Sequence, residues 1–268
     1  MNRKFSIIIF TDLDGSLLHR DTFQFDEIKN YLLNLISKGI HIIPNSSKTE
    51  KEILSFNKEL GADLPYISEN GSAIHGLNLL NINFPNKIIL SREKKEIIDI
   101  FNTKVPENLK NKCEFISQMS KKKQIEIFGL PSDKFKNAIE RKFSTPLLFK
   151  GDKISKNKML KILKKNSLTF QEGGRVVNLC DNVNKVKSMN KIIKIFKKIE
   201  DNFRVVAVGD NYNDLEMLRN SDVPCLVFND QFKQDQININ NLIVSSNPSP
   251  QGWVDVIKLA LDKLGYND

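Results

Sequence analysis

Two kinds of hydrophobic pattern follow each other in the first 84 residues of the chain. Residues 5–11 form an almost unbroken apolar run, which is typical of a parallel strand buried on both faces. Residues 26–38 have apolar positions at helical spacing, and Gly39 follows them as a C-cap signal. Next come a strand, a helix, a short strand and a turn, predicted over residues 40–44, 49–60, 66–67 and 69–71. This βαβαβ order predicts an α/β fold with a doubly wound parallel sheet.

The last third of the chain returns to the same alternation. An amphipathic helix is predicted over residues 184–199, and a buried strand over residues 204–209. The remaining elements, in order, are a helix, two short strands and a closing helix, over residues 213–219, 225–228, 242–244 and 252–264. We therefore expect both ends of the chain to belong to one sheet.

The middle of the chain has a different character. Helices are predicted there over residues 92–101, 132–143 and 155–165, and short strands over residues 124–128, 146–149, 168–171 and 175–179. This mixture predicts an α+β domain inserted into the α/β core. We expect the first part of the core at residues 1–84, the insertion at residues 85–184 and the second part of the core at residues 185–268.

The net charge and the length of the apolar runs limit the classes of partner that we expect for this chain. The chain of 268 residues has 41 Lys and Arg against 32 Asp and Glu, a formal charge of +9. The lysines are spread along the chain without a nucleic-acid-binding motif, so we expect no nucleic-acid partner and interpret the charge as a field that attracts anionic substrates. No apolar run is long enough to cross a bilayer, and we expect no signal peptide before the first strand. We expect a cytoplasmic monomer or homodimer with no membrane partner.

Cysteine and histidine are few and scattered. Neither has the spacing of a zinc site or a disulfide framework, which fits a reducing compartment. We expect the cysteines to be small core residues and two of the histidines, His19 and His75, to lie at the surface or in turns. The full set is Cys113, Cys180, Cys225, His19, His41 and His75.

Two carboxylates follow the first predicted strand. Asp12 and Asp14 are separated by one residue, and Gly15 permits a tight turn directly after them. The carboxyl edge of a parallel sheet is where ligands bind, and two close carboxylates repel unless a cation compensates them. Magnesium, which prefers carboxylate oxygens and phosphate, is the expected cation. A strand followed by an Asx-type turn is the alternative interpretation of this segment alone.

A second acidic pair favours the metal site. Asp210 and Asp214 follow the predicted strand at residues 204–209, and their spacing brings both to one face of a helical turn. Two acidic strand ends in one α/β sheet predict a magnesium site.

These motifs resemble those of the haloacid dehalogenase superfamily. Residues 12–18 and 209–214 resemble its first and fourth motifs, and Ser46 stands where the family has a Ser or Thr after the second strand. The family's lysine matches Lys185, although Lys187 lies two residues further on. The motifs occur in the family's order over nearly the whole chain. The position of the insertion is that of the larger α/β cap in this superfamily.

The resemblance implies a phosphatase mechanism. Asp12 would attack phosphorus and form an aspartyl-phosphate, while Asp14 would act as general acid and then as general base. Ser46 and Lys185 would hold the phosphoryl oxygens. The resemblance implies that four residues hold the magnesium ion: Asp12, Asp14, Asp210 and Asp214. Asp14 would contribute its backbone carbonyl, and Asp214 would be a ligand or would orient the other ligands.

One branch, the mannosyl-3-phosphoglycerate phosphatases, is similar in further segments. These are residues 46–50, 65–74, 173–175 and 249–253, while Ser16, Val186 and Ser249 depart from the family's pattern. The resemblance implies a phosphorylated sugar or glycerate as the substrate. The residues expected to contact it are Ser47, Lys48, Asn70, Gly71, Ser72, Gly174, Arg175 and Asn213. Simpler interpretations are a plain turn at residues 69–71, a hinge or bulge at residues 173–174, and a packing role for Trp253.

Several functions stay open at this point. A mannosyl and a glucosyl substrate are not separated, and a phosphatase for sucrose phosphate or hexose phosphates is the main alternative. A phosphotransferase or mutase would use the same aspartyl-phosphate. A catalytically silent binding module is disfavoured, because it would not need all the acids and the lysine together.

Overall fold

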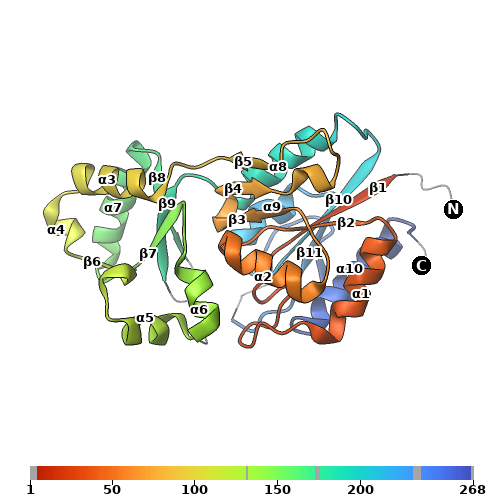
Figure 1. Ribbon diagram of the computed structural model, residues 1–268, viewed down its shortest axis with the longest axis horizontal. Helices are drawn as coiled ribbons and strands as arrows, with labels where there is room; N and C mark the ends of the chain where they lie inside the picture. The colour runs from red at the N-terminus through yellow and green to blue at the C-terminus, as the bar shows by residue number, and fades with distance from the viewer. Residues whose placement is uncertain (1–4, 131, 173–175, 232–236, 267–268) are drawn as a thin grey trace.

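The computed structural model describes residues 5–130, 132–172, 176–231 and 237–266, which form a larger and a smaller part (Figure 1). The larger part holds the first and last described strands and helices, and the smaller part, called the cap below, comes from the middle of the chain. Two segments of chain connect them. No described helix is both long and apolar enough to span a membrane.

The centre of the larger part is a five-stranded sheet in the order β12-β11-β10-β1-β2, with every neighbouring pair parallel. β1 pairs with β10 from Ser6 opposite Phe203 to Thr11 opposite Val208. Both strands therefore end at the same edge of the sheet, where the acidic segments follow them. The strands are β1 (Ser6–Thr11), β2 (His41–Pro44), β10 (Phe203–Gly209), β11 (Val223–Leu226) and β12 (Ile243–Val244).

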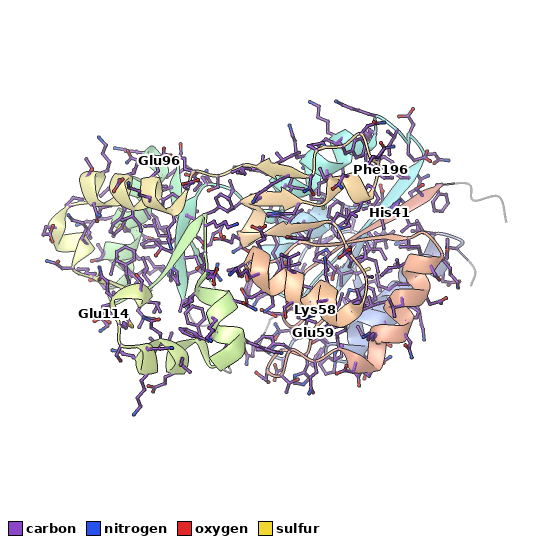
Figure 2. The ribbon with its side chains drawn as sticks, in the orientation of Figure 1. His41, Lys58, Glu59, Glu96, Glu114 and Phe196 are labelled. Carbon is purple, nitrogen blue, oxygen red and sulfur yellow. The ribbon has the colours of Figure 1, made fainter. Side chains whose placement is uncertain are left out.

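Helices cover both faces of this sheet, which explains the apolar run of β1. Ile7 and Ile9 pack on one face with α1, α2 and α10, whereas Ile8 and Phe10 pack on the other with α8 and α9. Figure 2 shows the side chains that fill these layers. The helices are α1 (Asp26–Ser37), α2 (Glu50–Leu60), α8 (Lys185–Phe196), α9 (Leu215–Arg219) and α10 (Gln251–Lys263). The doubly wound α/β core predicted from the sequence is confirmed.

The three histidines take different places in the larger part. His41 of β2 contacts Phe196 of α8 with ring centroids 5.5 Å apart, and both are labelled in Figure 2. His19 accepts backbone hydrogen bonds from Asp21 and Thr22 in a turn, as expected. His75 is only 5% exposed and stacks on Tyr66, so the expected surface or turn position is wrong for His75. Its strand, Ala73–His75, pairs with a strand on each side, which buries the side chain.

A small antiparallel sheet extends the larger part toward the cap. It consists of β3 (Tyr66–Ser68), β4 (Ala73–His75) and β5 (Lys87–Ile89), with β4 in the centre. A 3-10 turn, Glu69–Gly71, joins β3 to β4, and a second, Leu77–Leu79, follows β4. β5 thus pairs with a strand of the larger part although it follows residue 84. The domain boundaries at residues 84/85 and 184/185 stay predictions.

The cap is an α+β unit built on its own four-stranded antiparallel sheet in the order β6-β7-β9-β8. Its strands are β6 (Cys113–Phe115), β7 (Ser144–Phe149), β8 (Leu168–Glu172) and β9 (Val177–Asp181). Its helices are α3 (Lys94–Lys104), α4 (Glu107–Lys110), α5 (Lys121–Phe128), α6 (Ser132–Ile139) and α7 (Lys153–Lys165). The inserted α+β unit predicted from the sequence is confirmed.

One element of the cap differs from the prediction. Residues 124–128 form the end of helix α5 rather than a strand. Ser120 caps the helix by accepting a hydrogen bond from the Lys123 N–H, and Gly129 ends it in the left-handed conformation with φ 58°. Phe128 then packs against Phe135 of α6. Ile125 and Ile127 alternate with polar residues, a pattern that is typical of a strand but too short to exclude a helix. The capping residues at both ends stabilise the helix instead.

The two connecting segments are tied to each other where they leave the larger part. The backbone N–H of Arg92 donates to Asp181 Oδ2 at 2.6 Å, and its Nε donates to Asp181 Oδ1 at 2.8 Å. Ser91 Oγ donates to the same carboxylate at 3.3 Å. A planar guanidinium against one carboxylate fixes both distance and direction. This contact holds the start of α3 against the end of β9.

Candidate active site

The first acidic residue lies directly after β1 at the sheet edge. The Asp12 N–H continues the strand pairing by donating to the Val208 carbonyl at 2.9 Å, and Asp12 is only 7% exposed. Below it, Thr11 Oγ1 donates to the Asp12 carbonyl at 2.7 Å and accepts from the Trp253 indole N–H at 2.9 Å. The fully buried Trp253 is a core residue, as expected, and it also orders the backbone under Asp12.

Three carboxylates meet at this point. Oxygen atoms of Asp12, Asp210 and Asp214 all lie within 4.8 Å of one another, and all three residues are buried. Asp214 turns back toward the strand end because its Oδ2 accepts from the N–H groups of Asp210 and Asn211 at 3.1 and 3.2 Å. Gly209 makes room for this turn, since a Cβ there would lie 2.3 Å from the Asp214 Cβ.

The cluster carries more negative charge than its protein partners balance. Burial, with the charges of Asp214 and Asp12, raises the pKa of Asp210 to about 8. Burial also raises the pKa of Asp214 to about 6, although Lys185 acts against it. A bound cation would stabilise the ionised forms of these buried carboxylates, and carboxylate oxygens are ligands that Mg²⁺ prefers. The residues present therefore fit the expected metal.

Lys185 joins two of the three carboxylates. Its Nζ donates to Asp12 Oδ1 at 2.6 Å and to Asp214 Oδ1 at 2.8 Å, and its side chain is 2% exposed. Burial alone would lower the pKa of Lys185, but the two carboxylates raise it above its ordinary value, so the ammonium stays charged. Lys187, by contrast, donates to the Asn182 carbonyl in an exposed contact. Of the two candidate lysines, the structure brings Lys185 to the carboxylates.

The local sequence explains why Lys185 points inward. Asn184 caps α8 by accepting a hydrogen bond from the Lys187 N–H at 2.9 Å, which makes Lys185 the first helical residue. Asn45, after β2, donates its amide N–H to the Lys185 carbonyl at 3.0 Å. The start of α8 is thus attached to the same sheet edge as Asp12.

Asp14 lies apart from the three-carboxylate cluster and pairs with Lys48. Lys48 Nζ lies 2.9 Å from Asp14 Oδ1, and the Asp14 side chain is 35% exposed. Desolvation raises the pKa of Asp14, against the lowering effect of Lys48. A carboxyl with a raised pKa that is still reachable from outside suits proton donation. Its carboxylate is not part of the described metal cluster, which leaves the backbone carbonyl as its expected contribution.

Ser46 lies at the end of β2, beside β1. It is 1% exposed, and its N–H donates to the Ile67 carbonyl at 3.1 Å. Its hydroxyl oxygen accepts from the Lys48 N–H at 3.2 Å, which leaves the hydroxyl proton for another acceptor. The carbonyl of Ser46 accepts from the Asn70 N–H at 2.9 Å. Two strand ends, β1 and β2, thus carry Asp12 and Ser46 at one edge.

Comparison with known proteins agrees with this geometry. A family model described as haloacid dehalogenase-like hydrolase matches residues 9–257. The chain belongs to the haloacid dehalogenase-like hydrolases. Within this family, a glucosyl-3-phosphoglycerate/mannosyl-3-phosphoglycerate phosphatase from Persephonella marina is 31% identical over 96% of this chain and 98% of its own. An enzyme with the same name from Methanococcoides burtonii is 28% identical over 97% and 98%.

Solved structures of this hydrolase family share the fold. A phosphatase of the haloalkanoate superfamily from Bacteroides thetaiotaomicron has a TM-score of 0.70, with 13% identity, over 99% of this chain and 97% of its own. The family match and the phosphatase relatives identify the chain as a phosphoric monoester hydrolase.

The turn after β3 and its C-cap contain three residues expected to contact substrate, Asn70, Gly71 and Ser72. The N–H groups of Asn70 and Ser72 donate inside the protein, to Ser46 O and to Ser68 O, so neither faces an anion. Gly71 packs closely against the start of α8. A Cβ at this position would lie only 2.3 Å from the Asn184 carbonyl oxygen, so there is no room for a side chain. This turn supports the start of the Lys185 helix, and a substrate contact of these three residues stays a prediction.

Glu69 in the same turn links the hydrolase core to the cap. Its carboxylate accepts from the N–H groups of Lys142 and Phe143 at 2.9 and 3.2 Å and from Ser144 Oγ at 2.5 Å. Ser47, expected to contact substrate, accepts from Arg141 Nη1 at 3.2 Å through its carbonyl. The segment before β7 is therefore held at the sheet edge from both sides.

The other expected substrate residues are spread out. Asn213 is exposed in the 3-10 turn Tyr212–Asp214. Gly174 and Arg175 lie outside the described residues. Among the described members of this set, Lys48 reaches the carboxylate of Asp14.

Two residues of the site were missed by the sequence interpretation. Arg20 Nη2 donates to Asp210 Oδ2 at 2.5 Å, and Asn229 Nδ2 donates to the same oxygen at 3.0 Å. Asn229 follows the end of β11, so the strand-end rule that found Asp12 and Asp210 would also have found it. Arg20 lies in a polar loop, and its sequence position carries no such signal.

The cysteines take no part in this site. Burial raises the pKa of the Cys113 thiol to about 11 and that of Cys180 to about 12, and it raises the pKa of Cys225 as well. Thiols with such values are poor nucleophiles at neutral pH.

Proposed function

We propose that this chain hydrolyses a glycosyl-3-phosphoglycerate, glucosyl or mannosyl, to the glycosylglycerate and phosphate, with Asp12 as the covalent nucleophile. The observation that carries the proposal is the 2.6 Å contact between Lys185 Nζ and Asp12 Oδ1 beside two further carboxylates at one sheet edge. A carboxylate held by a lysine at the ligand-binding edge of a parallel sheet is suited to attack on a phosphoryl group.

In the first half-reaction, a carboxylate oxygen of Asp12 forms a bond to phosphorus and the ester P–O bond breaks. The leaving alkoxide takes the proton of the Asp14 carboxyl, whose raised pKa keeps that proton available. Lys185 and the Ser46 hydroxyl donate to the phosphoryl oxygens and offset their charge. The products of this step are the alcohol and an aspartyl-phosphate at Asp12.

In the second half-reaction, water attacks the phosphorus of the aspartyl-phosphate. The Asp14 carboxylate takes the proton of this water, and the bond between phosphorus and Asp12 breaks. Phosphate leaves, and both carboxyl groups return to their starting states. Lys48, 2.9 Å from Asp14 Oδ1, keeps Asp14 in place during both steps.

Asp12, Asp210, Asp214 and the Asp14 carbonyl are the proposed ligands of Mg²⁺. The ion would neutralise phosphate charge and stabilise the charge that develops during transfer. Asn229, Ser16 and Arg20 hold Asp210 by hydrogen bonds and so orient its oxygens.

The choice of substrate is supported by the named relatives, which match almost the whole chain. Glucosyl and mannosyl esters are both included, as in the names of these relatives. A capped phosphatase for sucrose phosphate or hexose phosphates is the alternative. We further propose a cytoplasmic enzyme, monomer or homodimer, with the cap at residues 85–184 closing over the site.

The test is phosphate release from purified protein with Mg²⁺ across a panel of esters. The panel contains mannosyl- and glucosyl-3-phosphoglycerate, sucrose phosphate, hexose phosphates and p-nitrophenyl phosphate. We expect kcat/KM to be highest for a glycosyl-3-phosphoglycerate and expect Asp12→Asn to release no phosphate from any ester. Faster turnover of hexose phosphates would overturn the substrate, and an active Asp12→Asn variant would overturn the mechanism.

A further inference from the structure

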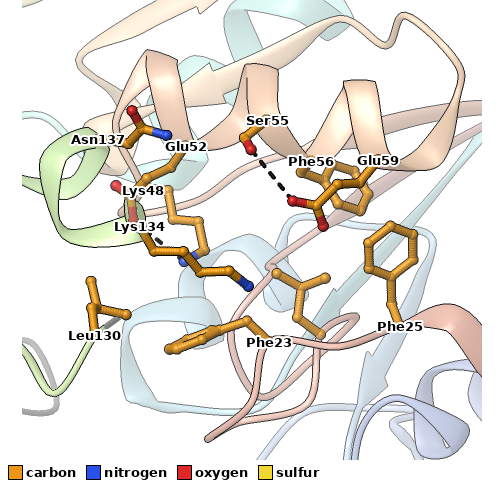
Figure 3. Close-up of a pocket in the computed structure, with 11 residues that line it drawn as sticks. Phe23, Phe25, Lys48, Glu52, Ser55, Phe56, Glu59, Leu130, Lys134 and Asn137 are labelled. Atoms are coloured by element: carbon orange, nitrogen blue, oxygen red, sulfur yellow. Dashed lines mark hydrogen bonds and ion pairs between the residues drawn. The ribbon is translucent and has the colours of Figure 1, made fainter. Parts of the chain in front are cut away.

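A cleft lies between the core and the cap, beside the proposed catalytic acid (Figure 3). Its walls come from the loop after β1 with Phe23, from α2 and the residues before it with Lys48, and from α6 of the cap with Lys134. The space not filled by atoms, including the open mouth, is about 480 Å³.

Lys48 connects this cleft to the chemistry. Its side chain lines the cleft, and its Nζ lies 2.9 Å from Asp14 Oδ1. In the proposed mechanism Asp14 protonates the oxygen of the leaving group. The part of the substrate beyond that oxygen therefore lies where the cleft begins.

Two lysines and two glutamates line the cleft, Lys48 and Lys134 against Glu52 and Glu59. Lys48 has two carboxylates close by, those of Asp14 and Glu52. Lys134 has no carboxylate partner among the described residues, and its Nζ lies 5.8 Å from the centre of the Phe23 ring. Figure 3 shows this ammonium pointing into the cleft.

The two acidic residues of the cleft each have a hydrogen-bond partner other than Lys134. Glu52 closes the capping box of α2 by accepting from the Thr49 N–H at 2.9 Å and from Thr49 Oγ1 at 3.0 Å. The pKa of Glu52 is lowered, because Lys48, Arg141 and these hydrogen bonds outweigh the effect of burial. Glu59 lies further along α2 and accepts from Ser55 Oγ at 3.4 Å. Lys134 thus remains available to an anion from outside.

Phe23 offers an aromatic face in the same cleft. Its backbone has φ 60°, an uncommon conformation for a bulky residue. The turn is held by the Phe23 N–H, which donates to the His19 carbonyl at 2.9 Å. Lys48 Nζ lies 4.6 Å from the centre of the ring on the side of the catalytic acid.

We propose that this cleft binds the leaving-group half of the substrate, with Lys134 pairing with a carboxylate of that half and Phe23 packing against its sugar ring. The proposal rests on the proposed function and deepens it, because it assigns the carboxylate of the glycerate to one lysine of the cap. An ester whose leaving group lacks a carboxylate cannot make this pair. Lys134 is thus a specificity-determining residue.

The test uses two esters that differ in the carboxylate, 3-phosphoglycerate and glycerol 3-phosphate. Lys134→Met keeps an apolar side chain over Phe23 and removes the charge. We expect it to lower the ratio of the two kcat/KM values by roughly 10- to 100-fold, the range for a hydrogen bond to a charged group, mainly through KM. Lys134→Arg should restore most of the ratio. Lys136→Met, on an exposed position of the same helix, is the matched control.

A second variant tests the aromatic face. Phe23→Leu should lower kcat/KM for a glycosyl-3-phosphoglycerate more than for 3-phosphoglycerate, because only the first ester has a sugar ring. An equal effect of this change on both esters would remove Phe23 from the proposal.

The outcomes separate this proposal from the proposed function. If the wild type turns over glycosyl-3-phosphoglycerates but Lys134→Met leaves the ratio unchanged, the substrate stands and the role of Lys134 is wrong. If the wild type hydrolyses other carboxylated esters better, the ratio still tests Lys134 while the proposed substrate fails. Calorimetric binding of the two esters to Asp12→Asn, with and without Lys134→Met, gives the same comparison without turnover.

Discussion

The Glu69 carboxylate accepts a hydrogen bond from the Ser144 hydroxyl at 2.5 Å, and this contact joins the turn after β3 to the first residue of β7 in the cap. The same carboxylate accepts two backbone N–H groups from Lys142 and Phe143. Glu69 is 3% exposed, so the three donors depend on it instead of water. Glu69 therefore joins three donors of the cap to the core through one buried side chain.

We predict that Glu69→Ala destabilises the protein by about 2 to 4 kcal/mol, because it leaves buried donors without an acceptor. Urea unfolding followed by circular dichroism measures the change. Glu140→Ala is the matched control, since Glu140 forms an exposed pair with Lys51 across the same boundary, worth less than about 1 kcal/mol. Equal effects of the two changes would contradict the role of Glu69.

The sequence predicted the parts of this fold that depend on strand periodicity and on strand ends. Asp12 and Asp210 are 198 positions apart, but each follows an apolar strand, and the parallel pairing of β1 and β10 brings them together. Contacts such as Arg20 with Asp210 or Glu69 with Ser144 join loops and turns. Loop conformation depends on the whole fold, so no local sequence pattern predicts these contacts.

The wrong prediction of a strand at the end of helix α5 has a similar cause. Over five residues an alternating pattern fits a strand and a helix end about equally well. The deciding contacts are the Ser120 cap and the packing of Phe128 on Phe135, and the second of these needs the tertiary structure.

The two lysines near the start of α8 are predicted to have different roles. Lys185→Met removes the donor to Asp12 and Asp214 and should lower kcat by roughly 10²- to 10³-fold, the range for loss of one charge-stabilising donor. Lys187→Met removes an exposed contact to a carbonyl and should change kcat by no more than about twofold. Phosphate release with thermal melting of both variants measures this. An inactive Lys187→Met with a folded, active Lys185→Met would reverse the assignment.

Metal removal is predicted to make the protein sensitive to alkaline pH. The pKa values of Asp210 and Asp214 are raised to about 8 and about 6, so the metal-free folded state holds more protons than the unfolded state between about pH 4 and 8. Its stability therefore falls as the pH rises through this window. Mg²⁺ binds the ionised form and should restore stability, by about 2.7 kcal/mol at a concentration 100 times its Kd.

Thermal melting in EDTA and in Mg²⁺ at pH 6 and pH 8 tests this. We expect the gain from Mg²⁺ to be larger at pH 8. Asp210→Asn should raise the melting temperature in EDTA at pH 8, since it removes one of the repelling charges, and should reduce the gain from Mg²⁺. A melting temperature that does not respond to Mg²⁺ in the unsubstituted protein would refute the metal site.

His75 is predicted to destabilise the protein in acid. Burial lowers the pKa of His75 to about 4, only partly offset by Glu50, whose Oε1 lies 3.7 Å from Nδ1. The unfolded chain takes up a proton near pH 6.5 while the folded protein does not until about pH 4, so stability is lost as the pH falls through this window. Between pH 7 and pH 5 the loss from this group is about 2 kcal/mol.

His75→Gln retains a polar partner for Ser68, whose Oγ lies 3.1 Å from the His75 Nε2, and removes the titration. Urea unfolding at both pH values should show a lower stability of the variant at pH 7 but a smaller loss toward pH 5. His41→Gln is the control, because it removes another histidine of the larger part, a half-buried one that contacts Phe196. An acid loss of the same size in His75→Gln and in the unsubstituted protein would assign the effect to other groups.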